Sequence, residues 1–143
     1  MKKKILEEIV CPVGEGASGY VTFQNKYGIF SGKSEFNMVE EDFKNFSRFV
    51  AIRYAEIRAE LKFARFRLKQ EKIKLRTIQS LKKDLEVNNI TPDKKTLRRI
   101  NLKLRDYSQS VSDWSNLCNH LKNAVQEQDK QREEILSRSR KDK

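Results

Sequence analysis

The chain has 143 residues and carries 31 Lys and Arg against 20 Asp and Glu, so its net charge is +11. Hydrophobic residues make up only 37% of it and charged residues 36%, a mixture too polar for a large globular core. No run of about 18 apolar residues is present, and Glu7 and Glu8 interrupt the basic start, so we expect neither a membrane-spanning helix nor a secretory signal. The composition favours long, exposed helices and a polyanionic partner, and two cysteines that make no disulfide framework point to a location in the reducing cytoplasm.

All five glycines lie between residues 14 and 32, so residues 1–38 differ in character from the rest of the chain. Two short runs rich in β-forming residues lie between residues 20 and 31 and flank a turn that contains Asn25 and Gly28. This pattern predicts a small β-hairpin, or an irregular segment, at the N-terminus. A two-stranded hairpin is only marginally stable in water, so we expect it to pack on a helix or on another subunit.

Residues 39–86 show the apolar spacing of a long helix, with Asn37 as a candidate cap and Glu40 three residues later. From Ile57 onward, apolar side chains recur at alternating steps of four and three residues, with Glu71 and Lys82 as polar interruptions. The apolar positions of this first seam are Ile57, Leu61, Ala64, Leu68, Leu75, Ile78 and Leu85. Such a heptad seam is typical of a coiled coil or of two long packed helices.

A second helix is predicted over residues 92–137, with Thr91 as its cap and Pro92 at its first position. Its seam repeats at steps of three and four through Leu97, Ile100, Leu104, Tyr107, Val111, Trp114, Cys118, Leu121, Val125, Gln128, Arg132 and Ile135. Residues 138–143 are expected to form a disordered basic tail. Because the connection between the helices is short, residues 39–137 should form a long antiparallel two-helix coiled-coil hairpin, which makes the fold mostly α-helical.

Lysines and arginines are concentrated in the first helix and at the start of the second. Six of them, which we call the basic stripe, recur on one face of the first helix: Arg58, Lys62, Arg65, Lys69, Lys72 and Arg76. The start of the second helix, where positive charge is unfavourable, adds four more, and the end of the first helix adds two: Lys94, Lys95, Arg98, Arg99, Lys82 and Lys83. We expect these twelve residues to form one surface that binds the phosphates of nucleic acid.

Three apolar residues of the first helix lie off the seam and would be exposed in an isolated hairpin: Phe63, Phe66 and Ile73. This exposure predicts that they contact another subunit, so we expect a homo-oligomer. Because basic residues surround Phe63 and Phe66, an alternative is that these rings stack on the bases of a single strand.

Residues that could support catalysis or bind a metal are few. The stretch Gly32 to Ser34 is similar to the end of a phosphate-binding loop, but the position that requires a glycine five residues earlier is Tyr27. His120 is the only histidine, and Cys11 and Cys118 are the only cysteines, so neither a zinc site nor a catalytic Cys–His pair is expected. We predict a protein that is not an enzyme and that has no metal or cofactor.

In layout, the chain resembles the UvsY-type recombination mediators of tailed phages. The similar stretches are Tyr54-Ala55-Glu56-Ile57-Arg58-Ala59-Glu60-Leu61 with its basic continuation, and the helix from Thr96 to Ile135 with Tyr107 and Trp114 in its seam. They cover about two-thirds of the chain, and residues 1–38 have no counterpart. The resemblance implies a helical protein that oligomerises, binds single-stranded DNA and helps to load a recombinase onto strands covered by a single-strand-binding protein.

The sequence therefore supports one leading hypothesis and leaves alternatives open. The leading hypothesis is a non-enzymatic, oligomeric protein that binds nucleic acid without reading its sequence, as a single-stranded DNA recombination mediator would. One alternative is a structural or assembly protein, such as a virion component or a scaffold, whose basic helix pairs with an acidic protein partner. Another is an inhibitor whose basic hairpin fills an acidic groove, and basic runs on helices are often merely solvated faces.

Overall fold

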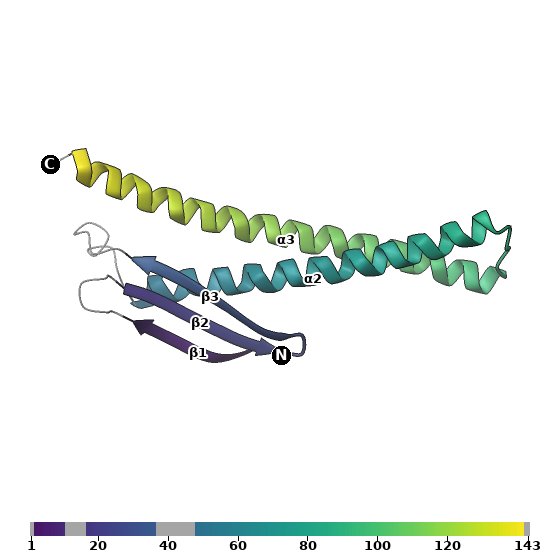
Figure 1. The fold of residues 1–143 in the computed structure, drawn as a ribbon, viewed down its shortest axis with the longest axis horizontal. Coiled ribbons are helices and arrows are strands. Elements are labelled where there is room, and N and C mark those ends of the chain that lie inside the picture. Colours follow the sequence, from purple (N-terminus) through teal and green to yellow (C-terminus); the bar gives the residue numbers. More distant parts are fainter. Residues whose placement is uncertain (1, 11–16, 37–47, 142–143) are drawn as a thin grey trace. The chain divides into compact units, whose positions relative to one another are not determined.

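Figure 1 shows the computed structural model, which describes residues 2–10, 17–36 and 48–141. The side chains of residues 17, 36, 48–50, 131, 132, 135, 136 and 138–141 lie outside this description. In chain order the elements are β1 (Lys3–Val10), β2 (Ala17–Asn25), β3 (Gly28–Phe36), α2 (Arg48–Val87) and α3 (Lys94–Lys141). The prediction of a mostly helical fold, with a helical hairpin and a small N-terminal β segment, is confirmed.

Contacts between residues divide the chain into two units. The first, which we call the sheet unit, comprises Met1–Phe63 and Asn119–Lys143, and the second, the hairpin unit, comprises Ala64–Cys118. The sheet unit contains the three strands, the first part of α2 and the last part of α3. The hairpin unit contains the remainder of both helices and the turn that joins them.

The N-terminal segment forms three antiparallel strands in the order β1-β2-β3, whereas the sequence pattern predicted two. The sequence of β1 does not alternate between apolar and polar residues, the pattern that reveals a strand. A register shift between Lys4 and Leu6 interrupts the strand, and most of its side chains are exposed. The predicted turn between β2 and β3 is confirmed. There, the Tyr27 backbone N–H donates to Asn25 Oδ1 at 2.8 Å, and Gly28 has a φ of +137°, which glycine adopts most easily.

One face of the sheet packs on α2 with side chains matched in size. This face consists of the cross-strand pairs Gly19–Ser34, Val21–Gly32 and Phe23–Phe30. The residues of α2 that meet it are spaced four apart: Ala51, Ala55, Ala59 and Phe63. Small residues therefore oppose small residues at one end of the contact, and aromatic rings oppose an aromatic ring at the other.

The two glycines of this face determine how closely the helix approaches the sheet. A Cβ atom on Gly32 would overlap the Ala55 carbonyl oxygen and would lie 2.5 Å from the Ala59 nitrogen. A Cβ atom on Gly19 would lie 2.8 Å from the Ala51 carbonyl oxygen. The backbones of sheet and helix are thus in direct contact, and no larger side chain fits at these two positions without a shift of the backbone.

The expectation that Phe63 is exposed is wrong, because the sheet covers its ring. The centroid of the Phe63 ring lies 5.0 Å from that of Phe30, 5.9 Å from that of Tyr27 and 6.0 Å from that of Phe23. The apolar character of Phe63 is therefore explained within one chain, without a second subunit or a stacked base. Contact of Phe66 and Ile73 with another subunit stays a prediction; the Ile73 side chain is 53% exposed.

Both predicted heptad seams are confirmed along most of their length. The seam positions of α2 from Ile57 to Leu85 and of α3 from Ile100 to Gln128 are buried or half-buried, and most positions between them are exposed. Leu97 departs from this pattern with 40% exposure. The candidate cap Asn37 lies outside the described residues, as do the side chains at the polar end of the second seam, Arg132 and Ile135.

α3 begins and ends later than predicted. Asp93, rather than Thr91, caps it, because Asp93 Oδ1 accepts a hydrogen bond from the Thr96 backbone N–H at 2.7 Å. The helix continues to Lys141, whereas the sequence predicted its end at residue 137. The physical reason is that no Gly or Pro follows Pro92, so nothing in the sequence terminates the helix earlier.

The two helical segments of the hairpin unit are antiparallel, as predicted. Three contacts join them: the Arg67 guanidinium 5.3 Å from the Trp114 ring centroid, Lys74 Nζ 6.0 Å from the Tyr107 ring centroid, and Lys82 Nζ 3.4 Å from Asn101 Oδ1. The turn that follows α2 contains Asn89 with a φ of +54°. In the described part of the chain, no helix has an 18-residue stretch apolar enough to cross a membrane.

The close contact of sheet and helix predicts a large effect of a single methyl group. The variant Gly32→Ala should destabilise the sheet unit by about 3 kcal/mol, because the added Cβ meets backbone atoms that cannot rotate away. Amide hydrogen exchange of β2 measures this loss. The control Ile29→Thr, at an exposed position of the same strand pair, should change stability by less than about 0.5 kcal/mol; equal protection in both variants would contradict the packing described.

Candidate nucleic-acid interface

The twelve predicted phosphate-binding residues are divided between the two units. Arg58 and Lys62 lie in the sheet unit. The other ten lie in the hairpin unit and are Arg65, Lys69, Lys72, Arg76, Lys82, Lys83, Lys94, Lys95, Arg98 and Arg99. All ten are exposed except Lys82, which is half-buried, and none forms an ion pair with a residue that the structure describes.

Arg58 is the member of the basic stripe that does not fit the prediction. Its Nη2 atom lies 2.9 Å from Asp129 Oδ1, and its Nη1 atom donates to the Lys33 carbonyl oxygen at 2.8 Å. The guanidinium thereby connects α2 with α3 and β3 within the sheet unit. We remove Arg58 from the candidate interface, because its charge is already neutralised by an acidic neighbour that only the fold brings close.

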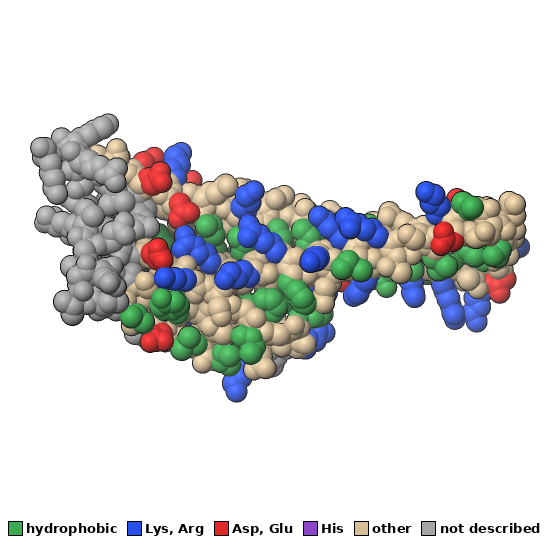
Figure 2. All heavy atoms as spheres, in the orientation of Figure 1, with side chains coloured by type: hydrophobic (Ala, Val, Ile, Leu, Met, Phe, Trp, Pro, Cys, Tyr) green, Lys and Arg blue, Asp and Glu red, His purple; other side chains and the backbone are tan. Residues whose placement is uncertain are grey.

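The hairpin unit has a large excess of positive charge. It contains fourteen Lys and Arg against six Asp and Glu, a net charge of +8 out of the chain's +11. In this unit, the ion pairs join Arg67 and Lys74 to Glu71, and Arg105 to Asp106. Figure 2 shows Lys and Arg side chains along the helices on the face that it draws. Most of the excess charge is therefore exposed and without an acidic partner among the described residues.

Two open grooves of the hairpin unit are each lined by six residues. The α2 groove is lined by Arg65, Leu68, Lys69, Lys72, Ile73 and Arg76. The α3 groove is lined by Lys94, Leu97, Arg98, Asn101, Leu102 and Arg105. Each groove combines two aliphatic side chains with three or four cationic ones. Such a surface offers charge to a phosphate and apolar contact to a sugar or a base.

The start of α3 differs from the anion site that the sequence predicted. The Asp93 carboxylate caps the helix, and hydrogen bonds from the Thr96 side chain and backbone hold the pKa of Asp93 below its ordinary value. This carboxylate accepts a hydrogen bond from the Thr96 backbone N–H, which is then not available to a phosphate. At this end the cap therefore takes one backbone N–H group of the first turn, and the side chains of Lys94 and Arg98 are the exposed cationic groups of the α3 groove.

A buried ion cluster at Glu71 was missed by the sequence analysis, which treated this residue as an interruption of the seam. Glu71 is only 4% exposed, and its Oε1 atom lies 3.2 Å from both Arg67 Nη2 and Lys74 Nζ. The two cations in turn lie over the rings of Trp114 and Tyr107. The signal in the sequence is the spacing of Arg67, Glu71 and Lys74 along one helix, which allows both ion pairs.

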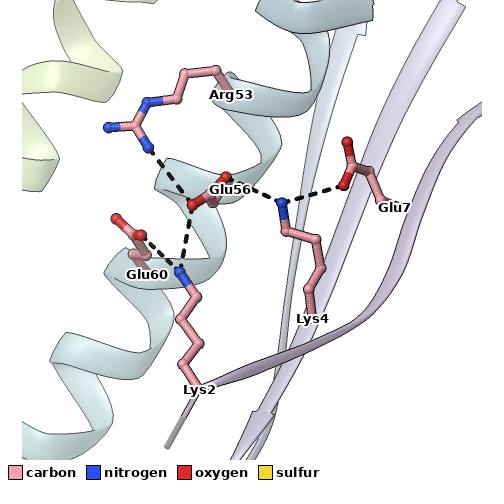
Figure 3. Close-up of polar contacts among 6 residues, drawn as sticks. All are labelled: Lys2, Lys4, Glu7, Arg53, Glu56 and Glu60. Atoms are coloured by element: carbon pink, nitrogen blue, oxygen red, sulfur yellow. Dashed lines mark hydrogen bonds and ion pairs between the residues drawn. The ribbon is translucent and has the colours of Figure 1, made fainter.

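Half of the cations with described side chains in the sheet unit pair with acids of the same unit, whereas three of fourteen do so in the hairpin unit. Figure 3 shows Glu56 of α2 between Lys2, Lys4 and Arg53, at 3.4, 3.6 and 3.7 Å. Lys2 also lies 2.9 Å from Glu60. Burial raises the pKa of Glu56, but the three cations outweigh this effect and hold its pKa below the ordinary value. These contacts fasten the start of β1 to α2.

Groups that could carry other chemistry have structural explanations. Gly32 to Ser34 lie within β3, so they do not form a phosphate-binding loop, and the Ser34 hydroxyl donates to the Ala51 carbonyl oxygen at 2.8 Å. Cys118 is buried, and burial raises the pKa of its thiol. Among the described residues, no group of three His, Cys, Asp or Glu side chains is arranged to hold a metal ion. Cys11 lies outside the described residues.

The ion cluster of Figure 3 predicts how the sheet unit responds to acid. Because the pKa of Glu56 is lowered by folding, the stability that it contributes is present near neutral pH and is lost as the pH falls through that lowered pKa. The variant Glu56→Gln should therefore be less stable than the parent at pH 7 and should lose less stability between pH 6 and pH 3. Urea unfolding across this range measures both effects, with Glu8→Gln as a control of equal charge. A parallel pH profile for Glu56→Gln and the parent would refute the assignment.

The buried cluster predicts a cost for neutralising Glu71. The variant Glu71→Gln should destabilise the hairpin unit by roughly 1–3 kcal/mol, because Arg67 is 12% exposed and loses its carboxylate partner. The fluorescence of Trp114, the only tryptophan, reports unfolding of this unit. Glu86→Gln, which removes the same charge from an exposed position of α2, should leave the unfolding midpoint nearly unchanged. The role assigned to Glu71 would be wrong if both variants unfolded together with the parent.

A scan against protein-family models and searches of curated proteins and of solved structures gave no match to this chain. The support for the candidate interface therefore comes from its own residues, charges and contacts.

Proposed function

We propose that the chain is a non-enzymatic protein that binds the phosphodiester backbone of nucleic acid, independently of base sequence, through the hairpin unit. The observation that carries this proposal is the separation of charge. Five of the ten Lys and Arg whose side chains are described in the sheet unit pair with acids of that unit, whereas eleven of the fourteen in the hairpin unit have no acidic partner among the described residues. Like charges at this density repel one another, and a polyanion removes that repulsion.

Single-stranded DNA is the proposed form of nucleic acid. The two grooves place aliphatic side chains beside the cations, namely Leu68 and Ile73 on α2 and Leu97 and Leu102 on α3. Apolar surface next to phosphate-binding groups suits exposed bases and sugars better than the polar edge of a duplex. The layout resemblance to UvsY-type mediators supports the same form and suggests a role in loading a recombinase onto single strands. Such a protein would act in the cytoplasm, which is that of the host if a phage encodes it.

Self-association is part of the proposal. Several large apolar side chains of the hairpin unit lie outside the two grooves and are exposed in the single chain: Leu81, Val87, Ile90 and Leu117. Exposed apolar surface of this kind is typical of contacts between subunits. Homo-oligomers would also align several basic hairpins along one strand, which raises the affinity through multiple attachment.

The proposal is tested by removing four cations of the α2 groove together. The variant Arg65→Gln/Lys69→Gln/Lys72→Gln/Arg76→Gln should bind single-stranded DNA more weakly and should reduce the slope of log affinity against log salt by roughly 3, because each phosphate contact contributes about 0.7. Fluorescence anisotropy of a labelled thirty-nucleotide strand at several salt concentrations measures the slope.

The matched control removes four exposed lysines of the sheet unit, Lys3→Gln/Lys26→Gln/Lys122→Gln/Lys130→Gln, with the same loss of net charge. It should keep the slope of the parent. Equal slopes for both variants would mean that only net charge matters and that the grooves are not the site. If the parent bound no nucleic acid at low salt yet captured a polyglutamate chain, the alternative of an acidic protein partner would replace the proposal.

A further inference from the structure

The two grooves of the hairpin unit are built from the same spaced set of residues. The α2 groove contains Arg65, Leu68, Lys69, Lys72, Ile73 and Arg76, and adding 29 to each number gives Lys94, Leu97, Arg98, Asn101, Leu102 and Arg105 of the α3 groove. Five of the six positions keep their chemical character. The stretches Ile73-Lys74-Leu75-Arg76 and Leu102-Lys103-Leu104-Arg105 are nearly identical. The hairpin unit therefore contains one basic element twice, once on each helix.

The sixth position differs, and a cation of the facing helix lies beside it. Asn101 stands in the α3 groove where the α2 groove has Lys72. Asn101 Oδ1 accepts a hydrogen bond from Lys82 Nζ of the facing helix, at 3.4 Å. The ammonium group of Lys82 thereby lies next to Asn101, although Lys82 is not among the residues that line the α3 groove. The α2 groove is lined by four cationic side chains, and the α3 groove by three with the Lys82 ammonium group beside Asn101.

The heptad positions place both grooves on the same side of the hairpin unit. The polar groove residues follow directly after seam positions, as Lys69 follows Leu68 on α2 and Arg105 follows Leu104 on α3. In two antiparallel helices packed through such seams, the positions that follow a seam residue lie on the same side of the plane through both axes. The α2 and α3 grooves therefore open in the same direction.

The register of the helices relates the two grooves by an approximate two-fold axis. Lys74 contacts Tyr107, so Arg76, two residues after Lys74, lies opposite Arg105, two residues before Tyr107. Arg76 and Arg105 are the last residues of their grooves. From this central pair the grooves run outward in opposite directions. Their centres are about 17 Å apart along the hairpin, since 11 residues separate them at 1.5 Å per residue.

We propose that the hairpin unit holds two phosphodiester segments at once, one in each groove and of opposite polarity. This inference rests on the proposed function and adds its stoichiometry and geometry. Each groove spans about 16 Å, since 11 residues separate its first and last cation at 1.5 Å per residue. Because the two grooves run in opposite directions, they suit two nucleic-acid backbones of opposite 5′-to-3′ polarity. One continuous strand would pass the second groove in the direction opposite to that in which it passes the first.

The number of short strands bound per chain tests this proposal. Isothermal titration calorimetry at low salt with a thymidine hexanucleotide, which has five phosphates, should give two bound molecules per chain. The variants Arg65→Gln/Lys69→Gln/Lys72→Gln and Lys94→Gln/Arg98→Gln/Arg105→Gln should each give one. The control Lys3→Gln/Lys26→Gln/Lys122→Gln, with the same loss of charge, should still give two. Circular dichroism verifies that all variants keep the helix content of the parent.

The outcomes separate this inference from the proposed function. One hexanucleotide per parent chain, or the loss of both sites in each groove variant, would overturn the paired grooves while a salt-dependent affinity for a thirty-nucleotide strand still supported nucleic-acid binding. Absence of binding to both the short and the long strand at low salt would overturn the proposed function together with the inference.

Discussion

The contact of two backbones, that of the β2–β3 pair and that of α2, is the constraint on which the sheet unit depends. Gly19 and Gly32 have no side chain to separate sheet and helix, and Ala51, Ala55 and Ala59 present only methyl groups in return. The strands thereby gain a buried face that a three-stranded sheet needs in order to be stable in water. The same contact brings Phe23 and Phe30 onto Phe63. A residue that would be an exposed ring on an isolated helix becomes part of the core.

The two units use the same charged residue types for different purposes. In the sheet unit, Lys2, Lys4 and Arg53 surround Glu56, and Arg58 reaches Asp129, so charge fastens one element to another. Such exposed and half-exposed ion pairs contribute modestly to stability, yet they neutralise the positive charges of the residues that form them. In the hairpin unit there are six acids against fourteen basic residues, and the cations of the grooves other than Arg105 have no acidic partner among the described residues. The nucleic-acid interface is therefore proposed in the hairpin unit, where basic residues outnumber acidic ones.

The hairpin unit also holds an acid where an apolar residue would be expected. Glu71 occupies a seam position, and burying a carboxylate is costly unless cations satisfy it. Arg67 and Lys74 do so from the same helix, while Trp114 and Tyr107 of the facing helix cover the two cations. A polar group at one seam position can select a single register between two helices. That register is what sets Arg76 opposite Arg105 and gives the two grooves their approximate symmetry.

The amino-acid sequence alone determined the two long helices, their seams, the turn at Asn25 and Gly28, and the concentration of basic residues between Arg65 and Arg99. These features depend on spacing within one element or on residues a few positions apart, so a periodic pattern reveals them. Only the tertiary structure decided the third strand, the burial of Phe63, the pairing of Arg58 with Asp129 and the cap at Asp93 instead of Thr91. β1 is an exposed edge strand with an interrupted period, and Asp129 is 71 residues from Arg58. Contacts across such separations leave no period in the sequence, because they arise only when packing brings distant segments together.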